Sequence, residues 1–116
     1  MNVTIFKNLS QRESNCEISY VLNSIKDGKF KEEITSLRNS KDKEEQSKLK
    51  KALYAFTPSA VLNTNRKFNE GDEYSGLIHL DYDNLNDIQK AKEIIQSIDY
   101  TYSSFISPSG NGLKVF

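Results

Sequence analysis

The chain has 116 residues, with 16 basic and 16 acidic side chains and a formal net charge of zero. This length fits one small domain spanning residues 1–116. Only 36% of the residues are apolar and no run is apolar enough to cross a bilayer, so a membrane-spanning segment is excluded. A single cysteine and a single histidine exclude a zinc site made of Cys and His ligands, so any metal site must use oxygen ligands.

The amino-terminal part, residues 1–53, is predicted to be mainly helical. A short strand at residues 3–6 comes first. The start of the sequence has no basic region followed by a long apolar run, so no secretory signal is visible and we expect a cytoplasmic protein. A polar loop is expected to extend from it through Asn15. Apolar side chains then recur three or four residues apart, which indicates three amphipathic helices. Their apolar faces consist of Ile18, Val21, Leu22 and Ile25, of Phe30, Ile34 and Leu37, and of Leu49 and Leu53.

Basic side chains gather in the third of these helices. Lys48, Lys50 and Lys51 lie close together in the sequence and are only partly balanced by acids. Because Glu44 precedes Lys48 by four residues, the segment fits a solvent-exposed helix face with charge pairs. The alternative is a patch that contacts the phosphates of nucleic acid. Both interpretations remain open at this point.

The remaining part, residues 54–116, is predicted to form a sheet. Residues 54–57 have the character of a short strand that ends before Pro58, because proline cannot donate to a central ladder. Residues 63–75 are polar and show no clear periodicity. A loop or a short helix is therefore expected over residues 63–75.

A strand, a helix and a second strand are predicted after residue 75. The run Gly76–Asp83 ends in two carboxylates, a helix begins near Asp87, and Tyr102–Ser107 is the second strand. This order predicts a βαβ crossover whose two strands run parallel as neighbours. A returning strand starts at Leu113. The expected fold class is α+β, with a mixed sheet and the amino-terminal helices packed on it.

Asp81 and Asp83 are the first candidate site residues. Because they are two apart on a predicted strand, their side chains leave the same face roughly 6.5 to 7 Å apart. Both can reach one cation, and Mg²⁺ or Mn²⁺ prefers such oxygen ligands while keeping positions for water or phosphate. The alternative is a strand end that passes into an acidic loop. His79 lies on the same face and is interpreted as a structural side chain.

The turn Ser107–Gly112 and the lysine that follows it are the second candidate. Its glycines let backbone amides approach an anion, and Lys114 places a positive charge where a phosphate could lie. An ordinary hairpin turn is the alternative. Because one crossover joins this turn to the carboxylates, we expect the two segments to meet in a nucleotide site.

Together with Ala55–Ser59, the two motifs resemble the VirE N-terminal domain family of bacterial mobile-element proteins, which is similar to the archaeo-eukaryotic primase, or prim-pol, catalytic module. The resemblance covers most of residues 48–116 and implies an RRM-like half of a prim-pol fold. In that module an Asp-x-Asp motif binds divalent metal, which carries over to Asp81 and Asp83. A Ser-Gly-x-Gly-like turn and the strand after it meet the incoming nucleotide. The corresponding positions here are Ser109, Gly110, Gly112 and Lys114.

Two departures from the prim-pol pattern bear on activity. Lys114 stands where these enzymes usually have histidine, so a phosphate contact is kept while a role for a neutral imidazole is not. The pattern also has a third carboxylate, and the sequence ends at Phe116 before one, which indicates a C-terminally incomplete domain. Whether the chain is an enzyme is therefore left open.

The function that the resemblance implies is a primase-like nucleotidyltransferase of a mobile-element or replication protein. It would bind a nucleoside triphosphate together with Mg²⁺ or Mn²⁺ and copy a single-stranded DNA template. The three lysines at positions 48, 50 and 51 would contact this template. The alternative is a non-catalytic primase-fold module that binds nucleic acid or a helicase partner. A fragment without activity is the third interpretation, and would leave Leu113–Phe116 as an unfinished strand with an unpaired edge.

Overall fold

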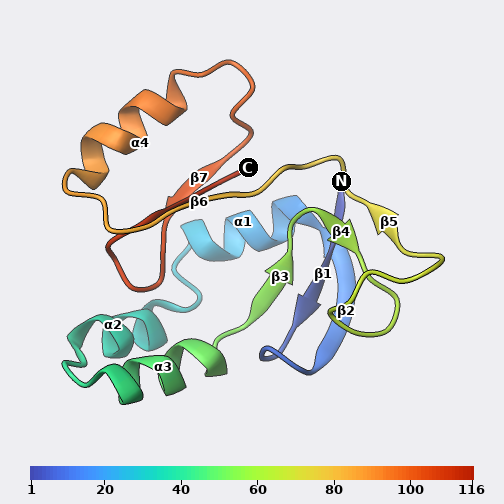
Figure 1. Cartoon of the computed structure of the whole chain (residues 1–116), viewed down its shortest axis with the longest axis horizontal. Helices are drawn as coiled ribbons and strands as arrows, with labels where there is room; N and C mark the ends of the chain where they lie inside the picture. The colour runs from blue at the N-terminus through green and yellow to red at the C-terminus, as the bar shows by residue number, and fades with distance from the viewer. The chain divides into compact units, whose positions relative to one another are not determined.

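The computed structural model describes all of residues 1–116 and divides them into two compact units. Unit 1 is Met1–Leu77 and unit 2 is Ile78–Phe116. Together they contain four helices and three small antiparallel sheets, which confirms the α+β class (Figure 1). None of the helices combines the length and the apolar character that crossing a membrane requires.

The main sheet of unit 1 has the strand order β2–β1–β3, with every pair antiparallel. Its strands are β1 (Asn2–Phe6), β2 (Arg12–Glu17) and β3 (Ala55–Thr57). The predicted strands near residues 3–6 and 54–57 are confirmed. The prediction of a loop through Asn15 is wrong, because β2 is an edge strand with mostly exposed polar side chains. Its pairing with β1 uses the backbone, which leaves no apolar alternation for the sequence to show.

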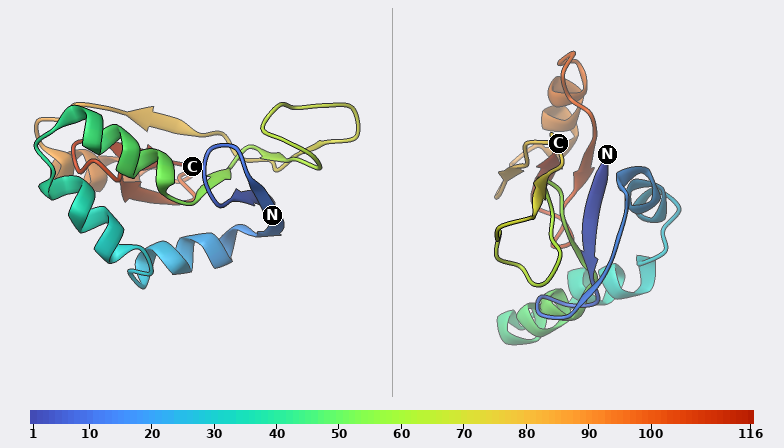
Figure 2. Two further views of the ribbon diagram at one scale, coloured as in Figure 1. Left: turned by 90° about the horizontal axis from the view of Figure 1, so that it is seen from below. Right: turned by 90° about the vertical axis from the view of Figure 1, so that its right-hand side faces the viewer.

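Three helices of unit 1 follow β2, as the apolar spacing predicted. They are α1 (Ile18–Lys26), α2 (Lys31–Asn39) and α3 (Lys43–Ala52). Helix α1 is followed by the cap residue Asp27, and the next residue, Gly28, adopts a φ of 74°, which glycine reaches without strain. Helix α3 is preceded by the cap residue Asp42, whose carboxylate accepts a hydrogen bond from the backbone N–H of Glu44 at 3.1 Å. Helices α2 and α3 pack side by side (Figure 2).

The core of unit 1 lies between β1 and α1. Val3, Ile18 and Val21 form a buried cluster, because the apolar stripe of α1 faces the side of the sheet to which Val3 points. The partly buried side chains packed against the cluster are Cys16, Leu22, Ile25, Phe56 and Leu77. This apolar contact fixes the helix on the sheet.

A buried hydroxyl joins the main sheet of unit 1 to its second, two-stranded sheet. This sheet is formed by β4 (Ala60–Val61) and β5 (Glu73–Tyr74). Thr4 is fully buried, and its Oγ1 accepts a hydrogen bond from the backbone N–H of Leu62 at 2.7 Å. Strand β5 lies inside residues 63–75, which were predicted as a loop or a short helix, so that prediction is wrong at this strand; the other residues of the segment contain no helix.

Unit 2 is a three-stranded sheet with one helix. Its elements are β6 (Leu80–Tyr82), α4 (Ile88–Gln96), β7 (Ser104–Ile106) and β8 (Leu113–Val115). Helix α4 begins after Asp87, whose carboxylate accepts a hydrogen bond from the backbone N–H of Lys90 at 3.0 Å, as predicted. The helix joins β6 to β7 and packs against β7 and β8 (Figure 1).

The strand order of unit 2 corrects one expectation about the crossover. The order is β6–β8–β7, so β8 separates the two crossover strands that we expected to be neighbours. Both pair with β8 in antiparallel fashion and therefore run in the same direction. The short turn after β7 folds β8 back as a hairpin partner, and a local hairpin forms with a smaller loop-closure cost than the crossover contact.

The central position of β8 also corrects the expectation of an unpaired edge after Gly112. Leu113 and Val115 are buried, and β8 pairs along both of its edges. The edges of this sheet are β6 and β7 instead. The strand predicted from Gly76 is also shorter, since β6 begins at Leu80.

Candidate functional site

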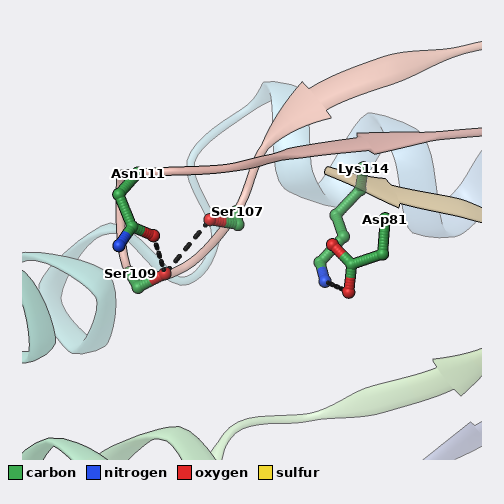
Figure 3. Close-up of polar contacts among 5 residues, drawn as sticks. All are labelled: Asp81, Ser107, Ser109, Asn111 and Lys114. Carbon is green, nitrogen blue, oxygen red and sulfur yellow. Dashed lines mark hydrogen bonds and ion pairs between the residues drawn. The ribbon is translucent and has the colours of Figure 1, made fainter. Parts of the chain in front are cut away.

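Asp81 and Lys114 form the centre of the candidate site. The antiparallel register of β6 and β8 places them directly opposite each other, so that both side chains leave the same face of the sheet. The carboxylate Oδ2 and the Nζ atom form an ion pair (Figure 3). The side chain of Asp81 is 40% exposed and that of Lys114 is 19% exposed. The pair is therefore partly shielded from water.

Asp83 lies one residue beyond β6 and faces the glycine turn. A Cβ atom placed on Gly112 would lie 2.5 Å from the carbonyl oxygen of Tyr82 and 3.2 Å from Asp83 Oδ1. Only glycine permits this close approach of the two backbones. The structure thus brings the two sequence motifs together, with Asp81 facing Lys114 and Asp83 facing Gly112.

The turn before β8 is closed by its own hydrogen bonds. The backbone N–H of Ser107 donates to the carbonyl of Gly112, and that of Gly110 donates to the carbonyl of Ser107, both at 2.9 Å. The hydroxyl of Ser109 lies 3.2 Å from that of Ser107 and donates to Asn111 Oδ1 at 2.8 Å (Figure 3). The backbone N–H of Gly110, which was expected to approach an anion, is therefore used within the turn. The one charged side chain of β8 is that of Lys114.

Two asparagines that the sequence analysis did not single out tie the turn to the end of β6. The backbone N–H of Leu85 donates to the carbonyl of Asn111 at 3.0 Å, and Asn84 adopts a φ of 53°. Asparagine is among the few residues that tolerate this left-handed conformation. The position of Asn84 directly after a predicted strand is the signal in the sequence that could have indicated this bend.

His79 packs its ring against an aromatic side chain of unit 2. Its ring stacks on Phe116, with ring centroids 5.0 Å apart and an interplanar angle of 16°. Partial burial lowers the pKa of the imidazole, and the charge of Lys114 lowers it further, while Asp81 acts in the opposite direction. The geometry fits the structural role that was predicted.

The carboxylates of Asp81 and Asp83 provide only a few oxygen ligands for a hard cation. No group of three or more His, Cys, Asp or Glu side chains is close enough to hold a metal ion. Asp81 in the middle of β6 and Asp83 directly after this strand are both exposed and offer carboxylate oxygen atoms. Mg²⁺ commonly takes one or two protein carboxylates and fills its other positions with water and substrate phosphates. The two residues fit a cation of this kind that arrives with a phosphate ligand.

The remaining candidates lie in unit 1. Lys48, Lys50 and Lys51 are exposed on α3, where they are accessible to a ligand. Cys16 is partly buried, and burial, followed by the charge of Glu17, raises the pKa of its thiol. This agrees with a packing side chain rather than a nucleophile.

Comparison with known proteins gives one match. The family model described as "BT4734-like, N-terminal domain" matches residues 48–116. This range includes more than half of the chain, all of unit 2 and the three lysines of α3. No curated protein matches the chain, and no solved structure matches it.

Proposed function

Because this chain belongs to the BT4734-like N-terminal domain family, whose match includes all of unit 2, we propose that it is a primase-like nucleotidyltransferase domain. It binds a divalent cation and a nucleoside triphosphate for nucleotide transfer on a DNA template. The proposal includes the finer resemblance to the VirE N-terminal domain family and to the prim-pol module, which rests on the two motifs of unit 2.

One observation carries the proposal. The register of β6 and β8 sets the carboxylate motif against the glycine turn and its lysine. Two carboxylates and an ammonium at one end of a sheet match the two charges of a cation–triphosphate complex, since the carboxylates suit the cation and the ammonium suits the phosphates. The segments that supply these groups are separated by α4 in the sequence.

Each residue has a defined part in the proposed site. Asp81 and Asp83 hold Mg²⁺ or Mn²⁺, which when bound neutralises charge on the phosphates. Lys114 binds a phosphate oxygen through its ammonium group. The turn residues Ser109, Gly110 and Gly112 shape the backbone next to this lysine. The exposed lysines of α3 at positions 48, 50 and 51 contact the phosphates of the template strand.

A second candidate function is a non-catalytic primase-fold module that binds nucleic acid or a helicase partner. The ion pair of Asp81 favours it, because Lys114 already balances the charge of that carboxylate without a metal. In this alternative the lysines of α3 provide the affinity for nucleic acid, and the aspartates do not contribute to binding.

Calorimetric titration of Mn²⁺ and a nucleoside triphosphate into the full chain tests the proposal. We expect binding by the parent and loss of at least tenfold in affinity in the variant Asp81→Asn, Asp83→Asn. The matched control is Glu93→Gln, Asp99→Asn, which removes the same charge from exposed positions of unit 2. Circular dichroism checks that all three proteins are folded.

The other outcomes separate the two candidate functions. A folded parent that does not bind the cation–triphosphate complex contradicts the proposed nucleotidyltransferase. Affinity for single-stranded DNA that falls with salt, and that is the same in the parent and the double aspartate variant with or without Mn²⁺, supports the non-catalytic module.

A further inference from the structure

The ion pair between Asp81 and Lys114 joins the edge strand β6 of unit 2 to its central strand β8. These are the two strands that carry candidate site residues. Because the register places the two residues directly opposite each other, their backbones cannot separate without breaking the ladder between β6 and β8. The two side chains can still part by rotation, and the lysine, with its flexible four-carbon stem, has the most freedom to do so.

One carboxylate cannot serve both the ammonium of Lys114 and a divalent cation at full strength. The two cations repel each other, and the partial burial of the lysine weakens the screening of that repulsion by water. Lys114 pairs with Oδ2 of Asp81, and the repulsion between the two cations therefore favours displacement of Lys114 when a divalent cation binds this carboxylate. Displacement leaves a half-buried ammonium without its partner, which is unfavourable.

A triphosphate removes this cost. Its oxygens offer the displaced ammonium a new anionic partner, and a lysine binds phosphate well as a point charge. The converse holds for the nucleotide, since Lys114 becomes available only when another cation replaces it at Asp81. Each ligand therefore relieves an unfavourable step in the binding of the other.

We infer that Lys114 couples cation binding to nucleotide binding, by pairing with Asp81 in the chain alone and with phosphate in the complex. The inference rests on the proposed function and adds the way in which its two ligands depend on each other. By thermodynamic linkage the coupling is reciprocal, and couplings of this kind typically amount to about 5–150-fold in affinity.

Two single substitutions test the coupling with one ligand at a time, which avoids the complex that Mn²⁺ forms with nucleotide in solution. In the full chain, Lys114→Gln is expected to bind Mn²⁺ alone about 5–150-fold more tightly than the parent, because the competing ammonium is gone. Free Mn²⁺ is measured by electron paramagnetic resonance. The control Lys90→Gln removes the same charge from an exposed position on α4 and is expected to stay within about twofold of the parent.

The second substitution acts on the nucleotide. In the presence of a chelator, Asp81→Asn is expected to bind the metal-free triphosphate more tightly than the parent, because Lys114 is released to the phosphates. Asp99→Asn controls for the loss of one negative charge, and Asp83→Asn controls for the loss of a neighbouring carboxylate that does not hold Lys114. Both controls are expected to show a smaller gain.

The outcomes distinguish the coupling from the proposed function. A parent that binds the Mn²⁺–triphosphate complex, together with Lys114→Gln that binds Mn²⁺ alone no more tightly than Lys90→Gln, overturns the coupling and leaves the proposed function in place. A folded parent that binds no Mn²⁺–triphosphate complex overturns both.

Discussion

Unit 1 and unit 2 differ in what their sheets place next to the core. In unit 1, β1 contributes Val3 to an apolar cluster with Ile18 and Val21, and its buried polar residue Thr4 is fully hydrogen bonded. In unit 2, β8 alternates buried Leu113 and Val115 with a lysine that faces a carboxylate. One strand thus supplies both core and candidate site, because successive side chains point to opposite faces.

This difference shows how a short segment can carry chemistry. Below about 40 residues, a single hydrophobic core is seldom sufficient for folding. Unit 2, Ile78–Phe116, is close to this size. Its buried apolar residues are concentrated on β8 and Phe116. The polar face of the same strand is left for Asp81 and Lys114, and the structure of unit 2 should therefore depend strongly on β8.

The largest expected effect compares the two cores. Ile18→Ala in unit 1 and Leu113→Ala in unit 2 each remove a fully buried side chain, and each should lower the free energy of unfolding by about 2–5 kcal/mol. Urea denaturation followed by circular dichroism measures both. Ile78→Ala, at a side chain that is 74% exposed, should stay within about 0.5 kcal/mol of the parent. A cost for Leu113→Ala as small as that of Ile78→Ala would show that β8 does not form the core of unit 2.

A smaller effect compares two glycines. Gly112→Ala should cost about 1–3 kcal/mol by overpacking, because the new Cβ would meet the carbonyl oxygen of Tyr82 at 2.5 Å. It should also weaken binding of the Mn²⁺–triphosphate complex, since β6 has to move. Gly71→Ala meets open space in unit 1 but has a φ of 88°, so its cost of about 1–2 kcal/mol is conformational and nucleotide binding should be unchanged. Equal binding by the two variants would contradict the close approach at Gly112.

The smallest expected effect concerns pH and the loop of unit 1. Hydrogen bonds donated by the backbone N–H groups of Asn63 and Asn69, both at 2.8 Å, lower the pKa of Asp72 from its ordinary value of 3.8. The stability that this carboxylate contributes is present above pH 3.8 and is lost as pH falls through the lowered value. The difference in unfolding free energy between the parent and Asp72→Asn should therefore shrink in acid. Denaturation at neutral pH and below pH 3.8 checks this, and a difference that grows in acid would reverse the assignment.

The helices were predictable from the sequence because their signals are local. The apolar spacing of Ile18 and Val21 marks α1, and Asp87 caps α4 as expected. The strand β2 was missed, because an edge strand is held by backbone pairing and its polar side chains carry no pattern. The candidate site was predictable in its residue types, since both motifs are contiguous in the sequence, but the role of Asn111 in tying the turn to β6 was not.

By itself, the sequence determined the class of the fold, most of the elements, and the presence of two carboxylates and a glycine turn with a lysine. Local propensity and spacing suffice for these features. Only the tertiary structure decided that β8 lies between β6 and β7, and therefore that Asp81 faces Lys114. Strand order and register depend on contacts between distant residues, and a shift of one residue would turn either side chain to the opposite face.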